Sequence, residues 1–357
     1  MTYVCSLVRG NLWVSAQFMQ FQVNLIYLAS LSGRVPIIPP FTPGPHLREF
    51  FHKYFQRYSS LKCLLAKKAG TLSFGQIFNI SLLRKDLSRP ILEWSDVKYN
   101  PTPTSIESPP DSEREPLGCW STKPEYDPQP MRANPTLNNL KLDVSYTRVP
   151  KSTRHTPDNN RDDFVIFGKL VPYIFSHNPL IERFEFMSPG PTGHRLPPDE
   201  HLSCFDHLYY TTSSEKTFEW EAPWSPAWNF VGKHVHFTND LVDTAKGYLS
   251  RAFNLSDGEI LPPVSSVIGF FPAPKTFTSS EQFIAIHSRR GDFESICTDP
   301  DHPEPSCLNP LSTFAEKVDE IRANLSMKHN VNVTRVLLAS SEFFLKYQSL
   351  SFNLNWR

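Results

Sequence analysis

The sequence predicts an α/β fold, because helix-like and strand-like segments alternate along it. Residues 17–31 carry apolar side chains at helical spacing and lead directly into a strand-like apolar run at 35–41. Near the other end, a strand-like run at 282–287, a helical stretch at 309–325 and a second strand-like run at 331–340 follow one another. Strand, helix and strand in that order form a βαβ unit, which predicts a parallel sheet.

Several more elements are expected between these two ends. The segments 74–87 and 90–98 again pair a helix-like stretch with an apolar run, and order is expected once more over 163–175. Residues 237–253 have the spacing of an amphipathic helix that should pack on a core. Its apolar face consists of Leu241, Ala245, Tyr248, Leu249, Ala252 and Phe253.

The middle of the chain is rich in proline. Eleven of the 33 prolines lie between Pro101 and Pro157, among many Ser, Thr, Asn and Asp residues with little periodicity. Such a composition is typical of a surface insertion or linker, and we expect one at about 99–162.

The segment "HSRRGDF", His287 to Phe293, follows directly on the strand-like run at 282–287. Ligands of parallel sheets bind beyond the carboxyl ends of the strands, where this segment and Ser340 to Glu342 would both lie. Two adjacent arginines can hold the oxygens of a diphosphate in a bidentate way that lysine cannot reproduce. Gly291 allows a close turn, and Asp292 and His287 can orient the guanidinium groups. The pattern favours a site for a phosphorylated donor.

Two other interpretations of this segment stay open at the level of the residues. A strand followed by Arg-Arg-Gly-Asp is also typical of an ordinary solvated turn. Arg290, Gly291 and Asp292 could alternatively form an exposed adhesion loop, which requires the preceding strand to lie at a sheet edge. The tryptophans, of which Trp120 is one, could stack on sugars, but buried structural aromatics are the commoner use of this residue.

Composition limits the class of partner. Lys plus Arg and Asp plus Glu both number 36, so no global field is available to hold nucleic acid. No run of 18 apolar residues predicts a membrane span, and the first residues do not resemble a signal peptide. None of the six cysteines forms a C-x-x-C pair, and no zinc site is implied; Cys297 and Cys307 could close a local disulfide. Four N-x-S/T sequons, at Asn79, Asn254, Asn324 and Asn332, permit glycosylation in the secretory pathway.

The segment "HSRRGDF" resembles the H-x-R-R-G-D-F signature of the protein O-fucosyltransferase-like glycosyltransferases, particularly their fungal branch. The resemblance extends from about Gln17 to Glu342. The segments that carry it, in the expected order, are "YLASLSGRVPIIPPF", "PILEWSDVK", "LGCWS", "LSCFDHLYY" and "PWSPAWNFVGKHVHFT".

The resemblance implies a GT-B-like fold, with two Rossmann-like domains facing a cleft. It also implies an enzyme that transfers fucose from GDP-fucose to a Ser or Thr hydroxyl with inversion, without a metal or other cofactor. It makes Arg289 the clamp on the β-phosphate, with His287, Arg290 and Asp292 shaping the pocket. Ser341 and Glu342 fall where the family contacts the nucleotide, although Ser341 replaces an acidic residue. Its implied partners are the nucleotide-sugar donor and a protein or glycan acceptor, and its implied location is the ER or Golgi. The family's Gly-rich turn is not clean here, with Gly10, Asn11 and Gln17 as candidates only.

The expected domains are an N-terminal, acceptor-side domain at 1–262, an atypical insertion at 263–282 and a partial nucleotide-sugar domain at 283–357. We hypothesise that the insertion is a translated intron, since Val264-Ser265 can be encoded by GTGAGT and Gln282 by CAG. The 75 residues from Phe283 to Arg357 are fewer than the roughly 100 to 150 of a complete nucleotide-binding domain. The alternative function is therefore a catalytically inactive or truncated relative that keeps at most nucleotide binding.

Overall fold

The computed structural model of the chain contains two compact units, Met1–Leu241 and Val242–Arg357. The domain boundaries expected near 262 and 282 lie outside the described residues. The structure describes residues 3–6, 16–42, 71–98, 111–123, 127–131, 133–155, 164–174, 185–209, 211–213, 225–253, 283–288 and 310–340.

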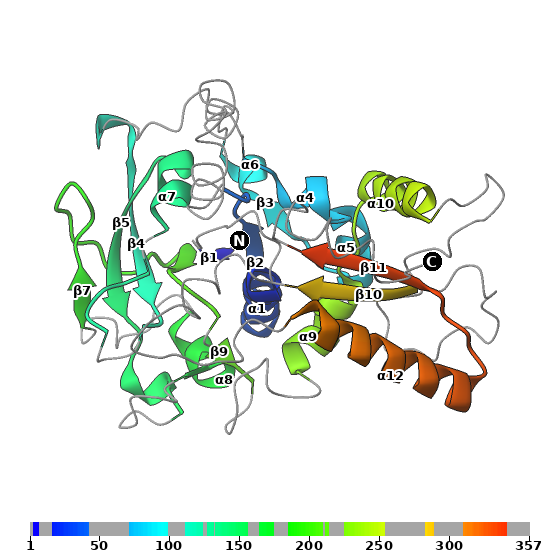
Figure 1. The fold of residues 1–357 in the computed structure, drawn as a ribbon. Helices are drawn as coiled ribbons and strands as arrows, with labels where there is room; N and C mark the ends of the chain where they lie inside the picture. Colours follow the sequence, from blue (N-terminus) through cyan, green and yellow to red (C-terminus); the bar gives the residue numbers. More distant parts are fainter. Residues whose placement is uncertain are drawn as a thin grey trace. The chain divides into compact units, whose positions relative to one another are not determined.

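The first unit is built on a sheet that has seven strands among the described residues, in the order β3-β2-β1-β8-β4-β5-β7 (Figure 1). Every pairing is parallel except that of β7 with β5 at one edge, so β4, β5 and β8 end at the same side of the sheet. The predicted α/β class is confirmed. The strands are β1 Tyr3–Ser6, β2 Val35–Ile38, β3 Leu92–Glu93, β4 Glu115–Ser121, β5 Leu142–Arg148, β7 Phe186–Ser188 and β8 Leu202–Phe205.

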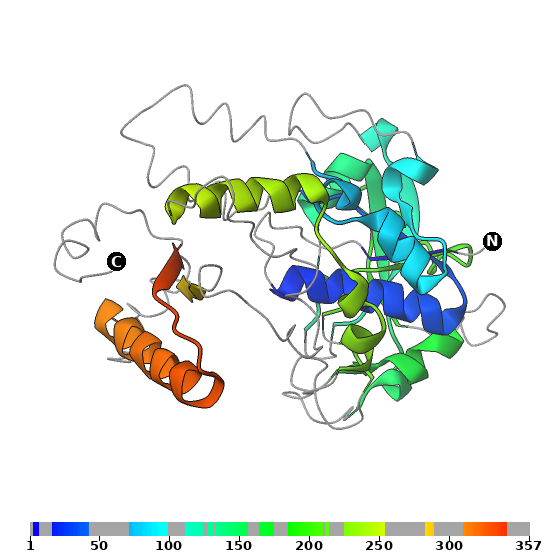
Figure 2. The same ribbon diagram turned by 90° about the vertical axis from the view of Figure 1, so that its right-hand side faces the viewer.

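Helix α1, Ala16–Ser32, connects β1 to the parallel strand β2 and lies along one face of the sheet (Figure 2). Phe21, Leu25 and Leu28 are buried there in a cluster that also holds Trp120 of β4 and Phe205. The helix predicted at 17–31 and the strand predicted after it are both confirmed. An apolar helix with almost no exposed side is expected where other elements cover it from both sides.

The opposite face of the sheet carries a second core. Helix α7, Asn134–Leu140, places Leu137 and Leu140 against Val144 and Tyr146 of β5. The helix ends at Lys141, whose positive φ of 53° turns the chain directly into β5. Helices on both faces of a parallel sheet give the three-layer arrangement of α/β domains.

The surface insertion expected at about 99–162 is corrected by the structure. Strands β4 and β5 and helix α7 all lie within it, and every residue of β5 is buried. Proline misled the prediction because it occupies positions that tolerate it: Pro116 lies in the exposed first part of β4, and Pro135 lies in the first turn of α7.

The remaining elements of the first unit are short. The predicted segment 74–87 forms two helices, of which α5 begins with Asn79 accepting a hydrogen bond from the Leu82 amide at 3.0 Å. These elements are α4 Phe74–Ile77, α5 Ile80–Leu87, α6 Trp94–Val97, β6 Val165–Ile166, α8 Phe167–Leu170, β9 Thr211–Thr212 and α9 Pro226–Phe230, with single 3-10 turns at Asp111–Glu113, Lys151–Thr153, Val171–Tyr173 and Gly232–His234.

Helix α10, Asn239–Ala252, forms where the spacing predicted it, but it does not pack on a core as expected. It has no buried residue, and Leu241 and Tyr248 are 40% and 65% exposed. An aromatic contact follows the helix directly: the ring centroid of Phe253, the residue after α10, lies 5.4 Å from that of Phe283. Helical spacing predicts the helix itself but does not specify a partner for the apolar side chains.

In the described part of the second unit, β10, Phe283–Ser288, pairs in parallel with β11, Arg335–Ser340, and helix α12, Leu311–His329, connects them. Figure 1 shows α12 running alongside the two strands, and its Val318 and Ile321 pack against Ile284. The predicted βαβ unit is confirmed. The helix ends at Asn330, which has a φ of 52° and turns the chain toward β11.

None of the helices that the structure describes is long and apolar enough to cross a membrane.

Candidate functional site

The carboxyl edge of the β10–β11 pair is the place from which the predicted donor motif begins. Ser288 is paired with Ser340, and each is the last residue of its strand. The chain therefore continues into Arg289 and into Ser341 from neighbouring points of one sheet edge. The sequence alone could suggest that the two strand ends are neighbours, and the strand register establishes it for Ser288 and Ser340.

His287 is the one predicted site residue that the structure describes. Its register partner is Ala339, and its side chain is exposed, as are those of Ala285 and Ala339 on the same face. Ser288 is buried on the other face, the one that α12 covers. The other predicted site residues, Arg289, Arg290, Asp292, Ser341 and Glu342, lie outside the described residues. His287 is therefore accessible at the edge where a ligand of the motif would bind.

The adhesion-loop interpretation required β10 to lie at a sheet edge. Within the described residues β10 pairs with β11 and with no strand on its other side. The loop itself, with Arg290, Gly291 and Asp292, lies outside the described residues, and this interpretation stays a prediction.

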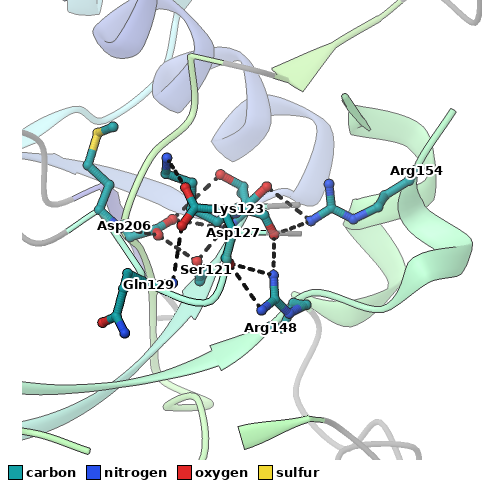
Figure 3. Close-up of polar contacts among 9 residues, drawn as sticks. Ser121, Lys123, Asp127, Gln129, Arg148, Arg154 and Asp206 are labelled. Atoms are coloured by element: carbon teal, nitrogen blue, oxygen red, sulfur yellow. Dashed lines mark hydrogen bonds and ion pairs between the residues drawn. The ribbon is translucent and has the colours of Figure 1, made fainter. Parts of the chain in front are cut away.

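A second group of polar side chains lies at the carboxyl edge of the first unit's sheet, where β4, β5 and β8 end (Figure 3). Its centre is Asp206, which directly follows β8 and is fully buried. One carboxylate oxygen, Oδ2, accepts hydrogen bonds from Ser121 Oγ at 2.6 Å and from the Met131 amide at 3.0 Å. The other, Oδ1, accepts from the Thr122 amide at 2.9 Å.

Two arginines surround the chain that follows β4. Arg148, the last residue of β5, donates to the carbonyl of Lys123 at 2.9 Å, and Arg154 donates to the carbonyls of Thr122 and Lys123 at 3.0 and 2.6 Å (Figure 3). Lys123 in turn pairs with Asp127 at 2.7 Å, and this hydrogen bond lowers the pKa of the Asp127 carboxyl. The guanidinium groups are thus used to fix the backbone of this loop.

The ionisation of two adjacent residues is shifted in opposite senses. Burial raises the pKa of Asp206 to about 6, against the effect of its hydrogen-bond donors, of which Ser121 is the strongest. Burial, with a smaller contribution from the charge of Lys123, lowers the pKa of His207 to about 3. His207 packs edge-on against Phe21, with 4.5 Å between the ring centroids. At neutral pH the pair is thus an ionised carboxylate beside a neutral imidazole.

The geometry of this cluster fits a structural role. Asp206 is enclosed and already accepts three short hydrogen bonds, so a ligand could reach it only by displacing them. The carboxylate instead ties the end of β8 to the end of β4 and to the loop at 127–131. This cluster is not among the predicted sites, although "CWST" and "CFDH" share a pattern that could have indicated it: a cysteine in a buried strand, then an aromatic residue, then polar residues at the strand end.

A disulfide connects β4 and β8 two residues before the Ser121 and Asp206 positions that are hydrogen-bonded to each other. Cys119 of β4 and Cys204 of β8 are bonded, and both are fully buried. They lie next to Trp120 and Phe205, the register pair that joins the two strands. This disulfide was not predicted; the predicted pair, Cys297 with Cys307, lies outside the described residues.

Helix α1 is attached to this edge by polar side chains. Asn24 donates to the Leu208 carbonyl at 2.7 Å and accepts from Gln20 at 2.7 Å, and the indole nitrogen of Trp228 donates to Gln20. Trp120 and Trp94 are buried, as expected of structural aromatics. Of the residues considered for a Gly-rich turn, Gly10 and Asn11 lie outside the described residues; for Gln17 in α1 only the backbone is described.

No protein-family model matches the chain, and no curated protein sequence matches it. Solved structures similar to it include POFUT1 in complex with GDP-fucose, at 11% sequence identity and a TM-score of 0.48, over 99% of this chain and 82% of the other. POFUT1 in complex with GDP is similar at 12% identity and a TM-score of 0.46, over 96% and 80% of the two chains. Because the identities are this low and both TM-scores lie below 0.5, the similarity assigns neither a family nor an activity to this chain.

Proposed function

We propose that the chain is a glycosyltransferase of the protein O-fucosyltransferase type, which transfers fucose from GDP-fucose to a Ser or Thr hydroxyl with inversion. The observation that supports this most directly is the parallel register of β10 and β11, which ends both strands side by side. From those two ends the chain continues into "RRGD" and into "SE". Motif and sheet edge together correspond to the usual ligand position of a parallel α/β sheet. A GT-B arrangement, with two Rossmann-like domains facing a cleft, is part of this proposal.

In the proposed reaction the oxygen of the acceptor hydroxyl forms a bond to the fucose anomeric carbon while the bond from that carbon to the β-phosphate oxygen breaks. GDP leaves with the electron pair and gains negative charge, and the hydroxyl proton passes to a base. Arg289 would stabilise that charge as a bidentate clamp, and this requires no metal ion. Arg290 and Asp292 would shape the diphosphate pocket, with His287 exposed at its border. Ser341 and Glu342 would contact the nucleotide from the neighbouring strand end.

The alternative is a relative without catalytic activity that retains at most nucleotide binding. One observation favours it: within the described residues the second unit holds a single βαβ unit. The doubly wound sheets that bind nucleotides generally contain more strands.

Isothermal calorimetry of the full chain with GDP and with GDP-fucose tests the proposal. Arg289→Ala should weaken GDP binding by about 10- to 100-fold, because a hydrogen bond to a charged group contributes roughly 1.5–3 kcal/mol. Arg251→Ala is the matched control, since it removes the same charge from the exposed surface of α10 in the same unit.

Three results are distinguishable. Loss of GDP binding in Arg289→Ala and its retention in Arg251→Ala would support the donor site. Equal affinities of wild type and Arg289→Ala would contradict it. If wild type binds GDP but transfers no fucose to a Ser- or Thr-containing acceptor, the inactive relative becomes the better description.

A further inference from the structure

The connection between α12 and β11 presents the sequon Asn332-Val333-Thr334 in an extended form. Asn332 and Thr334 are exposed, whereas Val333 between them is only 4% exposed and belongs to the core of the second unit. Such an alternation is that of an extended chain, in which residues two apart point to the same side. The carboxamide and the hydroxyl of this sequon therefore face solvent together.

Arg322 of α12 holds this stretch in place. Its guanidinium donates to the Val333 carbonyl at 2.9 Å and to the Thr334 carbonyl at 2.8 Å. The side chains of Asn332 and Thr334 make no hydrogen bond in the part of the chain that the structure describes. The backbone is thus fixed while the two side chains of the sequon remain available.

The other two described sequons are presented less well. Asn324 and Ser326 both lie within α12. In a helix a residue and the second one after it are about 200° apart around the axis, so these two side chains point to opposite sides. Asn79 is half-buried, and its carboxamide oxygen caps α5 through the Leu82 amide at 3.0 Å. Among the described sequons, Asn332 combines exposure with the geometry that an enzyme reading both residues requires.

The disulfide bears on the compartment in which this chemistry takes place. Cys119 and Cys204 are bonded and fully buried between neighbouring strands. Disulfides of this structural kind form and persist in oxidising compartments, which are also those where asparagine is glycosylated.

We propose that Asn332 is an N-glycosylation site of this protein. The Nδ2 atom of Asn332 forms a bond to the anomeric carbon of a lipid diphosphate-linked oligosaccharide. The bond from that carbon to the diphosphate breaks, the lipid diphosphate leaves with the electron pair, and Nδ2 releases a proton to a base of the transferring enzyme. Thr334 is the hydroxyl residue that this enzyme recognises.

The position of Asn332 is compatible with a ligand at the other end of the strand pair. Asn332 precedes the amino end of β11, whose first residue is Arg335. The edge next to His287 and Ser340 lies at the carboxyl ends of β10 and β11. A glycan at Asn332 would therefore extend from the amino end of β11 and leave the carboxyl edge uncovered.

Secretion of the full chain behind a cleavable signal peptide from a glycosylating yeast tests the proposal. Peptide mapping of the wild type after enzymatic deglycosylation in heavy-oxygen water should find Asn332 converted to a labelled aspartate. A non-reducing map of the same sample, with the Cys119–Cys204 bridge intact, verifies folding. Asn332→Gln and Thr334→Ala should each lose one glycan on a gel, whereas the conservative Thr334→Ser should keep it.

Asn324→Gln is the matched control and should migrate as the wild type does. The proposal is overturned if secreted, disulfide-bonded wild type contains unmodified Asn332. It is equally overturned if Asn332→Gln retains all of the glycan of the wild type.

Discussion

Asp206 shows how a single buried carboxylate can link pH to the stability of the first unit. Burial raises the pKa of Asp206 from 3.8 to about 6. At a pH between these two values the folded chain keeps a proton on this carboxyl that the unfolded chain has already released. Between about pH 4 and 6 the folded state therefore binds more protons than the unfolded state does. Stability from this group is present at low pH and is lost as the pH rises through that window, by about 3 kcal/mol in total.

Ser121→Ala should destabilise the protein more at pH 8 than at pH 5. The hydroxyl donates to Asp206 at 2.6 Å. A hydrogen bond to an ionised group contributes about 1.5–3 kcal/mol, against roughly 0.5–1.5 for a neutral pair. Urea unfolding at the two pH values measures the difference. Ser145→Ala is the control, because within the described residues the Ser145 hydroxyl bonds to the backbone of Leu196 and to no ionisable side chain, so the loss of stability should be the same at both pH values. Equal losses for Ser121→Ala would show that Asp206 does not change its charge in this range.

His207→Gln should reveal the opposite dependence. The pKa of His207 is lowered from 6.5 to about 3, so its stabilising contribution is present above pH 6.5 and is lost as the pH falls toward 3. As the pH falls from 6 to 4, the free energy of unfolding of the variant should rise relative to that of the wild type by about 1.4 kcal/mol for each pH unit. Chemical unfolding over that range measures the slope. Asp206→Asn serves as the comparison and should show a slope of the opposite sign; a flat difference for His207→Gln would mean that the imidazole is protonated in the fold.

At the scale of elements, β4 and β8 are joined by the disulfide, by the side-chain hydrogen bonds of Asp206 and by a backbone hydrogen bond from the Asp206 amide to the Trp120 carbonyl at 2.9 Å. Their register contains the single pair Trp120 and Phe205 within the described residues. The bridge closes a sequence separation of 85 residues. Cross-links of that span restrict the unfolded chain strongly.

The double variant Cys119→Ala, Cys204→Ala should lower the free energy of unfolding by about 4–5 kcal/mol on the chain-entropy scale. Reductant should lower the stability of the wild type by a similar amount, measured by urea unfolding. The same reductant applied to the variant is the control, because any further change would come from other cysteines. A variant as stable as the unreduced wild type would show that the bridge contributes nothing to folding.

The elements show which part of the fold follows from local pattern. Residues 17–31 and 309–325 were predicted as helices, and α1 and α12 form there, because their apolar spacing is regular. β5 lies within the proline-rich stretch that was predicted as an insertion, and its Leu-Asp-Val-Ser-Tyr-Thr-Arg alternation is typical of a strand exposed on one face, whereas β5 is buried on both faces. Polar residues of β5 have tertiary partners: Asp143, for example, accepts a hydrogen bond from the Thr192 amide through Oδ2 at 3.1 Å. Local pattern could not indicate those partners.

In the candidate site, too, the part that depends on local sequence pattern could be predicted and the part that depends on tertiary contacts could not. The carboxyl edge of the βαβ unit could be predicted, because handedness and strand order leave few choices once the elements are known. The Asp206 cluster could not, since it joins residues 121 to 131 with residue 206 across the sheet. The disulfide was missed for a similar reason: Cys119 and Cys204 become neighbours only when β8 inserts beside β4.

At the scale of the whole molecule, the two units differ in the size of their cores. In the described residues the first unit has two large buried clusters, one on each face of its sheet. The described core of the second unit contains Ile284, Val318 and Val333 as its buried members. Since buried apolar area is the main stabilising contribution to folding, the second unit should open at a lower free energy.

Hydrogen exchange followed by mass spectrometry measures this difference within one sample. Peptides from α12 and from β10 and β11 should exchange well before peptides from β4, β5 and β8, of which β4 and β8 are also restrained by the disulfide. Peptides from exposed α10 provide the internal reference for a helix without a buried side chain. Protection of α12 equal to that of β5 would mean that the second unit is stabilised by more than its described core.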